Sequence, residues 1–208
     1  GVWSSSDATV ATVGSTTGVV TGVAAGSAVV SYTIGSGCSA TTTITVNPLS
    51  AITGPTSVCV GQTVTLANAT PGGVWTISNS AVATIGSSSG TVTGIVSGSP
   101  YVTYTIPAGG CYTTFPMVVH TLPAAITGSS SVCIGSTTAL ANTSAGGTWA
   151  SSNTGVATIN SAGVATGVSA GVTTITYTLA TGCRKTASLS VNPLPVPITG
   201  TPVVCVDA

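Results

Sequence analysis

The chain has 208 residues, of which only two are basic and two are acidic, so its formal net charge at neutral pH is zero. Without more lysine and arginine there is no cationic surface to hold a phosphate backbone or an anionic bilayer, which excludes nucleic-acid binding. Apolar residues make up 43% of the chain, but nowhere do they form the run of about 18 residues that a membrane span needs. Disordered segments are charged and poor in β-branched residues, whereas this sequence is the reverse, so we expect a folded chain.

One stretch of the sequence occurs three times. Each copy begins with the word Gly-x-Trp and ends with a cysteine, at residues 1–38, 73–111 and 147–183. A second stretch precedes the later two copies, at 51–73 and 125–147, and begins again at 197. The repeat is as long as one small domain, which indicates a string of independently folded modules rather than a solenoid.

Proline-bearing words separate the repeats, at 46–49, 122–123 and 191–195. They predict a partial domain at 1–49 (third to last strands), complete domains at 51–122 and 124–195, and the first strand of a further domain at 197–208. Linkers this short and rich in proline are stiff. The open ends have two explanations: the chain is a window of a longer repetitive protein, or strand 197–208 completes the partial domain of a neighbouring copy.

Within each repeat, apolar residues alternate with small or hydroxyl residues, as at 43–46, 64–66, 82–85 and 102–106. A period of two predicts strands with one buried face, and the Gly- and Pro-rich words between them predict turns. No stretch has helical spacing. About seven short strands per repeat predict an all-β fold of tandem immunoglobulin-like antiparallel β-sandwich domains with Greek-key order.

The words VCVGQTVTL, VWSSSDATVATV, GVVTGVAAGSAVVSYT and TTTITVNPL resemble the group 2 bacterial immunoglobulin-like (Big_2-type) repeat. The form is the cysteine-bearing one, similar to tandem repeats in large secreted surface proteins of Bacteroidota. The resemblance covers the whole chain and implies the immunoglobulin-like fold. Members of that family serve as adhesin stalks, spacers and filament bodies, and the family supplies no catalytic residue to carry over.

Six aromatic residues recur at the same two positions of each repeat, and we predict that they fill the sandwich core. They are Trp3, Trp75, Trp149, Tyr32, Tyr104 and Tyr177. The alternative for the tryptophans is a sugar-stacking platform. Three further aromatic residues occur only in the middle copy and are the better candidates for a specific contact: Tyr101, Tyr112 and Phe115.

The six cysteines also fall at two positions. Cys59, Cys133 and Cys205 lie in the predicted first strand, and Cys38, Cys111 and Cys183 lie at the start of the predicted last strand. Metal ligation is disfavoured because the chain has no CxxC, one histidine and almost no carboxylate. Disulfides fit better and predict an oxidising, extracellular location.

Two pairing schemes are open. One joins the cysteines of each repeat, Cys59 with Cys111 and Cys133 with Cys183. Strand order argues against it, because the two positions lie at opposite ends of a sandwich and bridged Cα atoms must lie within about 7 Å. The other scheme joins Cys59 to Cys183 across the junction between two repeats.

No reactive centre is predicted. One histidine and two aspartates at unrelated positions cannot form a Ser-His-Asp triad or a calcium site, so we expect no enzyme activity, cofactor or metal. His120 occupies the position of Asn47 and Asn192, where a junction hydrogen bond is the expected role. The triplets at 68–70 and 142–144 match the N-glycosylation pattern, although a chain rich in Ser and Thr forms such triplets by chance.

The sequence therefore predicts a structural segment of a long extracellular filament or cell-surface stalk, stiffened by disulfides and short proline linkers. Its expected partners are copies of itself or neighbouring repeats, since a net charge of zero lowers the cost of association. Two alternatives remain: adhesin repeats that bind glycan or protein directly, and a spacer in a secreted multidomain enzyme.

Overall fold

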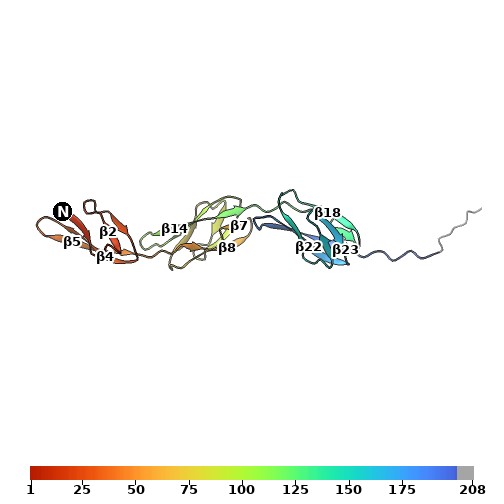
Figure 1. Cartoon of the computed structure of the whole chain (residues 1–208), viewed down its shortest axis with the longest axis horizontal. Helices are drawn as coiled ribbons and strands as arrows, with labels where there is room; N and C mark the ends of the chain where they lie inside the picture. The colour runs from red at the N-terminus through yellow and green to blue at the C-terminus, as the bar shows by residue number, and fades with distance from the viewer. Residues whose placement is uncertain (201–208) are drawn as a thin grey trace, which may run out of the picture. The chain divides into compact units, whose positions relative to one another are not determined.

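The computed structural model of the protein describes residues 1–200. These residues form strands, turns and bends, with no helix among them (Figure 1). Contacts divide the chain into two compact units, Gly1–Val119 and the part from His120 onward, and each unit has its own hydrophobic core. The predicted first strand at 197–208 falls largely outside the described residues, and the predicted domain boundaries stay predictions.

The first unit begins with two small sheets, the N-terminal sheets. Their strands are β1 (Val2–Ser5), β2 (Ala11–Val13), β3 (Val20–Gly22), β4 (Gly26–Thr33) and β5 (Ser39–Val46). One sheet has the order β1-β4-β5 and the other is β2-β3. Every residue of β3 is exposed, whereas its counterparts β12 (Thr91–Gly94) and β21 (Val164–Gly167) alternate between half-buried and buried. The reason is that β12 and β21 each pair with a strand on either side.

The middle sandwich follows in the same unit. Its strands are β6 (Ile52–Thr53), β7 (Ser57–Cys59), β8 (Thr63–Thr65), β9 (Ala67–Asn68), β10 (Val74–Ile77), β11 (Ala83–Ile85), β12, β13 (Tyr101–Thr105), β14 (Tyr112–Pro116) and β15 (Val118–His120). One layer contains β10-β13-β14 and the other β11-β12-β8, with the short pairs β15-β7 and β6-β9 beside them.

The third sandwich is the more regular one. Its strands are β16 (Thr127–Gly128), β17 (Ser131–Cys133), β18 (Thr137–Ala141), β19 (Thr148–Ser151), β20 (Ala157–Ile159), β21, β22 (Gly171–Thr178) and β23 (Arg184–Asn192). They form two four-stranded sheets, β16-β18-β21-β20 and β17-β23-β22-β19. Neighbours in each sheet are out of sequence order, as in a Greek key. The predicted class, tandem immunoglobulin-like sandwiches, is confirmed.

Strand order departs from the prediction in one respect. The predicted first strand is split: β16 pairs with β18 in one sheet, and β17 then crosses to the other sheet and pairs with β23. The second pairing is parallel, with Val132 opposite Val191, so the sandwich is not wholly antiparallel. The first and last strands run in the same direction, and this fixes which end of the sandwich each cysteine occupies.

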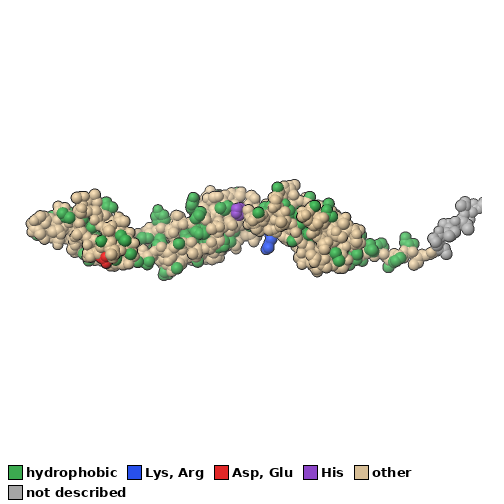
Figure 2. Space-filling model, viewed as in Figure 1, with side chains coloured by type: hydrophobic (Ala, Val, Ile, Leu, Met, Phe, Trp, Pro, Cys, Tyr) green, Lys and Arg blue, Asp and Glu red, His purple; other side chains and the backbone are tan. Residues whose placement is uncertain are grey.

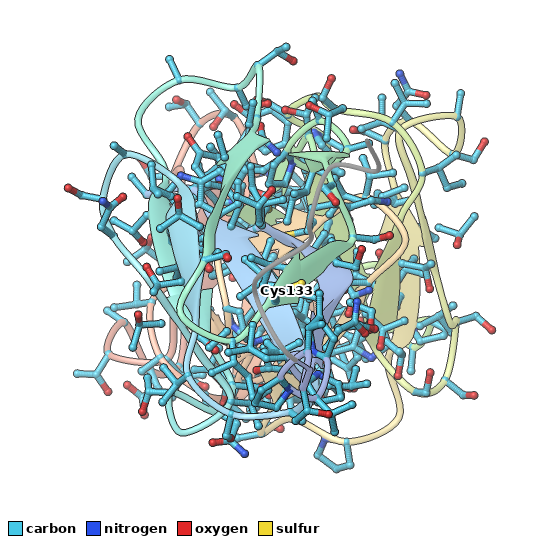
Figure 3. The ribbon with its side chains drawn as sticks, turned by 90° about the vertical axis from the view of Figure 1, so that its right-hand side faces the viewer. Cys133 is labelled. Atoms are coloured by element: carbon cyan, nitrogen blue, oxygen red, sulfur yellow. The ribbon has the colours of Figure 1, made fainter. Side chains whose placement is uncertain are left out.

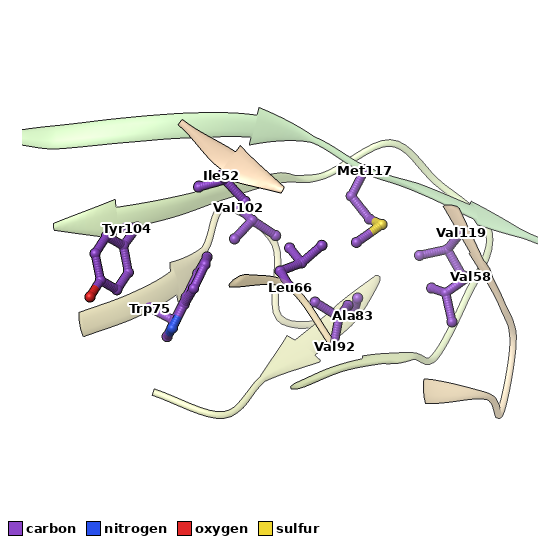
Figure 4. Packing of buried hydrophobic residues seen from close by; sticks show 10 residues of the cluster. All are labelled: Ile52, Val58, Leu66, Trp75, Ala83, Val92, Val102, Tyr104, Met117 and Val119. Atoms are coloured by element: carbon purple, nitrogen blue, oxygen red, sulfur yellow. The ribbon is translucent and has the colours of Figure 1, made fainter. Parts of the chain in front are cut away.

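The core of the middle sandwich lies between its two layers (Figure 4). Alternation along each strand places one side chain in two inside, as in β13, where Val102 and Tyr104 are buried between partly exposed neighbours. Leu66 and Met117 are the largest of its fully buried aliphatic side chains. Among the described residues no buried side-chain nitrogen or oxygen lacks a hydrogen-bond partner.

Candidate functional site

The residue that leads into the middle sandwich is held by two side chains of the sandwich. The Asn68 Nδ2 group donates to the carbonyl oxygen of Ser50 at 2.6 Å. The backbone N–H of Ser50 donates to the Thr70 hydroxyl at 2.9 Å. The backbone N–H of Thr70 donates to Asn68 Oδ1 at 2.9 Å, which fixes the asparagine. The backbone N–H and C=O of Ser50 are therefore both hydrogen-bonded to side chains of the sandwich that follows. We name Asn68 and Thr70 the linker clamp.

The third sandwich has the same clamp. The Asn142 Nδ2 group donates to the Ala124 carbonyl oxygen at 2.7 Å, and the Ala124 N–H donates to the Ser144 hydroxyl at 2.9 Å. The N–H of Ser144 donates to Asn142 Oδ1 at 2.9 Å. The residue before each clamped residue is apolar: Leu49 packs against the middle core, and Pro123 is buried. Each linker is therefore part of the sandwich that follows it.

An aromatic pair lies directly beneath each clamp. The Tyr104 hydroxyl donates to the Thr70 carbonyl oxygen at 2.6 Å and accepts from the N–H of Gly73 at 2.9 Å. Its ring lies 4.6 Å from the Trp75 ring, centroid to centroid, and the two residues are direct partners across β10 and β13. The clamp, the tyrosine and the tryptophan thus form one connected cluster.

The other repeats have the same aromatic pair. Ring centroids are 4.8 Å apart for Trp149 and Tyr177 and 4.7 Å for Trp3 and Tyr32. Trp75, Tyr104 and Tyr177 are buried, whereas Trp149, Trp3 and Tyr32 are half-buried. Such pairs contribute about 0.5–1.5 kcal/mol beyond the area that they bury. These rings are packed on the fold, which leaves no open face for the sugar-stacking alternative at Trp75.

Two glycines of the repeat lie against the aromatic pair. A side chain at Gly73 would collide with the Tyr104 ring. Gly90 has φ +67°, and a Cβ there would lie 3.0 Å from the Trp75 ring. Only glycine satisfies both the left-handed backbone and the close approach. The repeated Gly-x-Trp word is therefore a packing requirement.

The clamps were not predicted. The sequence pattern indicates only N-glycosylation triplets at these residues, yet the Asn68 and Asn142 amides already donate to a linker carbonyl. A glycan on either amide would compete with that bond. The signal that could have revealed the role is the equal spacing of 18 residues between asparagine and clamped residue in both repeats.

The cysteines occupy two structural positions. Cys59 and Cys133 are the last residues of β7 and β17, and we call this the strand-end position; Cys133 is labelled in Figure 3. Cys38, Cys111 and Cys183 each directly precede the last long strand of their repeat, β5, β14 and β23, and we call this the turn position. Cys205 lies outside the described residues.

One cysteine at each position is disulfide-bonded, namely Cys59 and Cys183. Cys38, Cys111 and Cys133 are free thiols. Disulfides at these three cysteines stay a prediction. The pairing of Cys59 with Cys111 and of Cys133 with Cys183 is wrong, because Cys111 and Cys133 are free.

Strand geometry gives the reason. Cys133 lies opposite Asn192, the last residue of β23, whereas Cys183 precedes its first residue. A nine-residue strand separates its ends by about 30 Å, far beyond the roughly 7 Å that a disulfide allows between Cα atoms. The two positions within one sandwich cannot meet. The pairing of Cys59 with Cys183 stays a prediction.

Among the described ionisable residues, Asp7 has a structural role in a turn. Thr9 donates to Asp7 Oδ1 from its hydroxyl at 2.6 Å and its N–H at 2.9 Å, and these bonds lower the pKa of Asp7. Asn79 and Asn153 accept the equivalent turn bonds in the other repeats, so Asp7 is a turn residue. His120 ends β15 and is half-buried; its junction role stays a prediction.

Within residues 1–200 no three His, Cys, Asp or Glu side chains gather into a possible metal site. The same residues contain no helix that could cross a membrane. Figure 2 shows a face made almost entirely of hydrophobic and uncharged polar groups. Tyr101 and Tyr112 are 57% and 66% exposed, whereas Phe115 packs against the middle core.

Comparison with known proteins gives a general likeness only. No family model and no curated protein matches the chain. Solved structures that resemble it include invasin, a bacterial integrin-binding protein, at 15% identity over 91% of this chain and 51% of that one, with a TM-score of 0.45. The S-layer protein rSbsC is 21% identical over 97% of this chain and 35% of that one, with a TM-score of 0.31.

Drosophila N-cadherin EC1-4 is 11% identical over 93% of this chain and 66% of that one, with a TM-score of 0.32. The chain spans about a third of the length of the S-layer structure. These values leave the function of the chain to be argued from its own residues.

Proposed function

We propose that the chain is a structural segment of an extracellular filament or cell-surface stalk, in which repeated sandwiches are held in line by clamped linkers and disulfides. The observation that carries the proposal is the linker clamp. A flexible tether would leave its peptide groups to water, whereas Ser50 and Ala124 have both N–H and C=O bonded to the following sandwich. Fixing these residues costs conformational entropy, which is expected where linker direction matters.

The cysteines and the surface support an extracellular, structural role. The disulfide-bonded Cys59 and Cys183 are typical of oxidising compartments outside the cytoplasm. Arg184 and Lys185 are the only basic residues, so trypsin-like proteases have almost nowhere to cut. Lateral or end-to-end association with copies of the chain meets little charge repulsion, since the net charge is zero.

Electron microscopy of the oxidised protein tests the proposal. We expect extended rods of uniform width for the wild-type chain. The double variant Asn68→Ala with Asn142→Ala removes both clamps and should give bent or variably angled particles. The matched control is Asn160→Ala, which removes an asparagine that caps a turn and forms no hydrogen bond to a linker residue. Rods that are equally straight in the double variant would contradict the proposal.

An adhesin is the second candidate, and one observation favours it. Tyr101 and Tyr112 are exposed on neighbouring strands β13 and β14 of the middle sandwich, and exposed tyrosines are frequent in binding surfaces. The third sandwich has Thr174 and Arg184 at these positions, so such a surface would occur once. Glycan-array binding that disappears in Tyr101→Ser with Tyr112→Ser would favour this function. A spacer role in a secreted multidomain enzyme is the remaining alternative.

A further inference from the structure

The free thiols have the same backbone surroundings as the bonded ones. At the strand-end position, Gln62 N–H donates to the Cys59 carbonyl at 3.0 Å, and Ser136 N–H donates to that of Cys133 at 3.1 Å. The next residues, Val60 and Ile134, each form a parallel bridge to a glycine of the opposite layer. The backbone around Cys133 therefore has the same hydrogen bonds as the backbone around the disulfide-bonded Cys59.

The turn position is equally constant. The N–H of Leu179 donates to the Cys183 carbonyl oxygen at 2.9 Å, and the equivalent bonds to Cys111 and Cys38 are 2.8 and 3.0 Å. A glycine with positive φ precedes each of these cysteines, at 85°, 69° and 83° for Gly37, Gly110 and Gly182. The turn that carries a bonded sulfur in the third sandwich carries a free one in the first two repeats.

We propose that Cys133 is a cross-linking thiol that forms a disulfide with a turn-position cysteine of another repeat of this kind, and that Cys38 and Cys111 are the receiving thiols. The inference rests on the proposed function, because it needs repeats that meet end to end outside the cytoplasm. Two observations carry it. First, a cysteine at each position is disulfide-bonded: Cys59 at the strand-end position and Cys183 at the turn position. Second, the two positions of one sandwich lie too far apart to pair, because Cys133 lies opposite Asn192, at the far end of β23 from Cys183.

Accessibility agrees with this assignment. Cys133 and Cys38 are exposed and Cys111 is half-buried, so an oxidant and a partner thiol can reach them. The reaction joins two thiols into one S–S bond with loss of two protons and two electrons. A small-molecule disulfide accepts the electrons by thiol–disulfide exchange and leaves as two thiols. A strand-end cysteine pairs with a turn-position cysteine. A bond between two Cys133 residues would instead join two identical strand ends.

Peptide mapping of the whole chain tests the proposal. The chain is kept in a buffer of oxidised and reduced glutathione, free thiols are blocked, and the disulfide-linked peptides are identified by mass without reduction. All variants carry Cys205→Ser, so that the cysteine outside the described residues does not contribute. We expect linked multimers in which most of the Cys133 peptide is joined to the Cys38 or Cys111 peptide. Cys133→Ser should abolish these multimers.

A matched variant separates position from mere exposure. Ser80→Cys in the Cys133→Ser background places a thiol on an exposed turn residue that has neither cysteine position. We expect no recovery of multimers. Recovery, a majority of Cys133 joined to Cys133, or Cys133 found only as its glutathione adduct would each overturn the proposal.

Micrographs of the same samples distinguish this inference from the proposed function. Straight rods without the opposite-position pairs would overturn the cross-link alone. Opposite-position pairs in particles that are not extended would leave the cross-link standing and overturn the structural role.

Discussion

The middle and third sandwiches have the same plan but differ along their last two strands. In the third sandwich β22 and β23 pair without interruption over eight residues. In the middle sandwich the equivalent ladder covers five residues, Tyr101–Thr105 with Tyr112–Pro116, and resumes only as an isolated bridge between Gly98 and Val119.

Two prolines explain the difference. Pro100 stands where the third sandwich has Thr173, and Pro116 stands where it has Ser188. Proline has no N–H to donate to a ladder, and Pro100 acts only as an acceptor, for the N–H of Met117 at 3.0 Å. The fold survives because its core, clamp and aromatic pair are retained. The comparison indicates that packing specifies this sandwich and that a complete ladder is dispensable.

The largest expected effect tests whether the two cores are equivalent. Leu66→Ala and Leu140→Ala remove matching side chains, 2% and 6% exposed. Each should lower the free energy of unfolding of its own sandwich by about 2–5 kcal/mol, since a buried leucine loses its transfer energy and leaves a cavity. Denaturant unfolding followed by the single tryptophan of that sandwich, with the other two changed to Phe, measures it. If either variant lowers the free energy of unfolding by less than about 1 kcal/mol, the two cores do not depend equally on this leucine.

A transplanted proline tests the ladder. Thr173 is buried, and its hydroxyl accepts from the N–H of Asn153 at 3.1 Å and lies 3.0 Å from the Ser151 hydroxyl. Thr173→Pro should cost the third sandwich about 1–3 kcal/mol, because residue 173 loses its N–H opposite Leu189 in the ladder and the Asn153 N–H loses the Thr173 hydroxyl. The reverse change, Pro100→Thr, should alter the middle sandwich by less than about 1 kcal/mol, since a regained donor is offset by a freer unfolded chain. Equal and opposite effects would contradict this interpretation.

The clamps should contribute alike in the two sandwiches. Asn68→Ala and Asn142→Ala should each cost about 1–2 kcal/mol and speed hydrogen exchange at Ser50 and Ala124. Asn68→Asp is the sharper control, because it retains the acceptor for Thr70 but loses the donor to Ser50. It should cost no less than the alanine change, because a carboxylate oxygen would then face the Ser50 carbonyl oxygen. If hydrogen exchange at the Ser50 amide is unchanged in both Asn68→Ala and Asn68→Asp, Asn68 does not hold the linker.

The smallest effects concern charge. With four charged residues in all, raising the salt from about 0.05 to about 0.5 M should shift the unfolding temperature by less than about 2 °C, since there is little to screen. The pKa of Asp7 is lowered from 3.8 in the folded chain. Its stabilisation is therefore present above the unfolded pKa and is lost as the pH falls through the folded value. Asp7→Asn introduces the residue that the other repeats have at this position. The variant should therefore no longer lose stability in the N-terminal sheets as the pH falls.

The sequence by itself determined the strands, the repeat and the recurring positions of the aromatic residues. A period of two allows only one face of a strand to be buried, and the Gly-x-Trp word places tryptophan at the same point of every repeat. These are local properties, so they can be read from neighbouring residues. The excess of hydroxyl over charged side chains likewise predicted a surface with few ionisable groups.

Only the tertiary structure decided how distant residues meet. The crossing of β17 to pair in parallel with β23 was not predicted, because the alternation of residues indicates a strand but does not indicate its neighbour. The clamp joins Asn68 to Ser50, 18 residues earlier, and gives a glycosylation-like triplet a structural task. Both depend on which strands become neighbours after folding, because hydrogen bonds and disulfides require proximity in space, and position along the chain does not provide it.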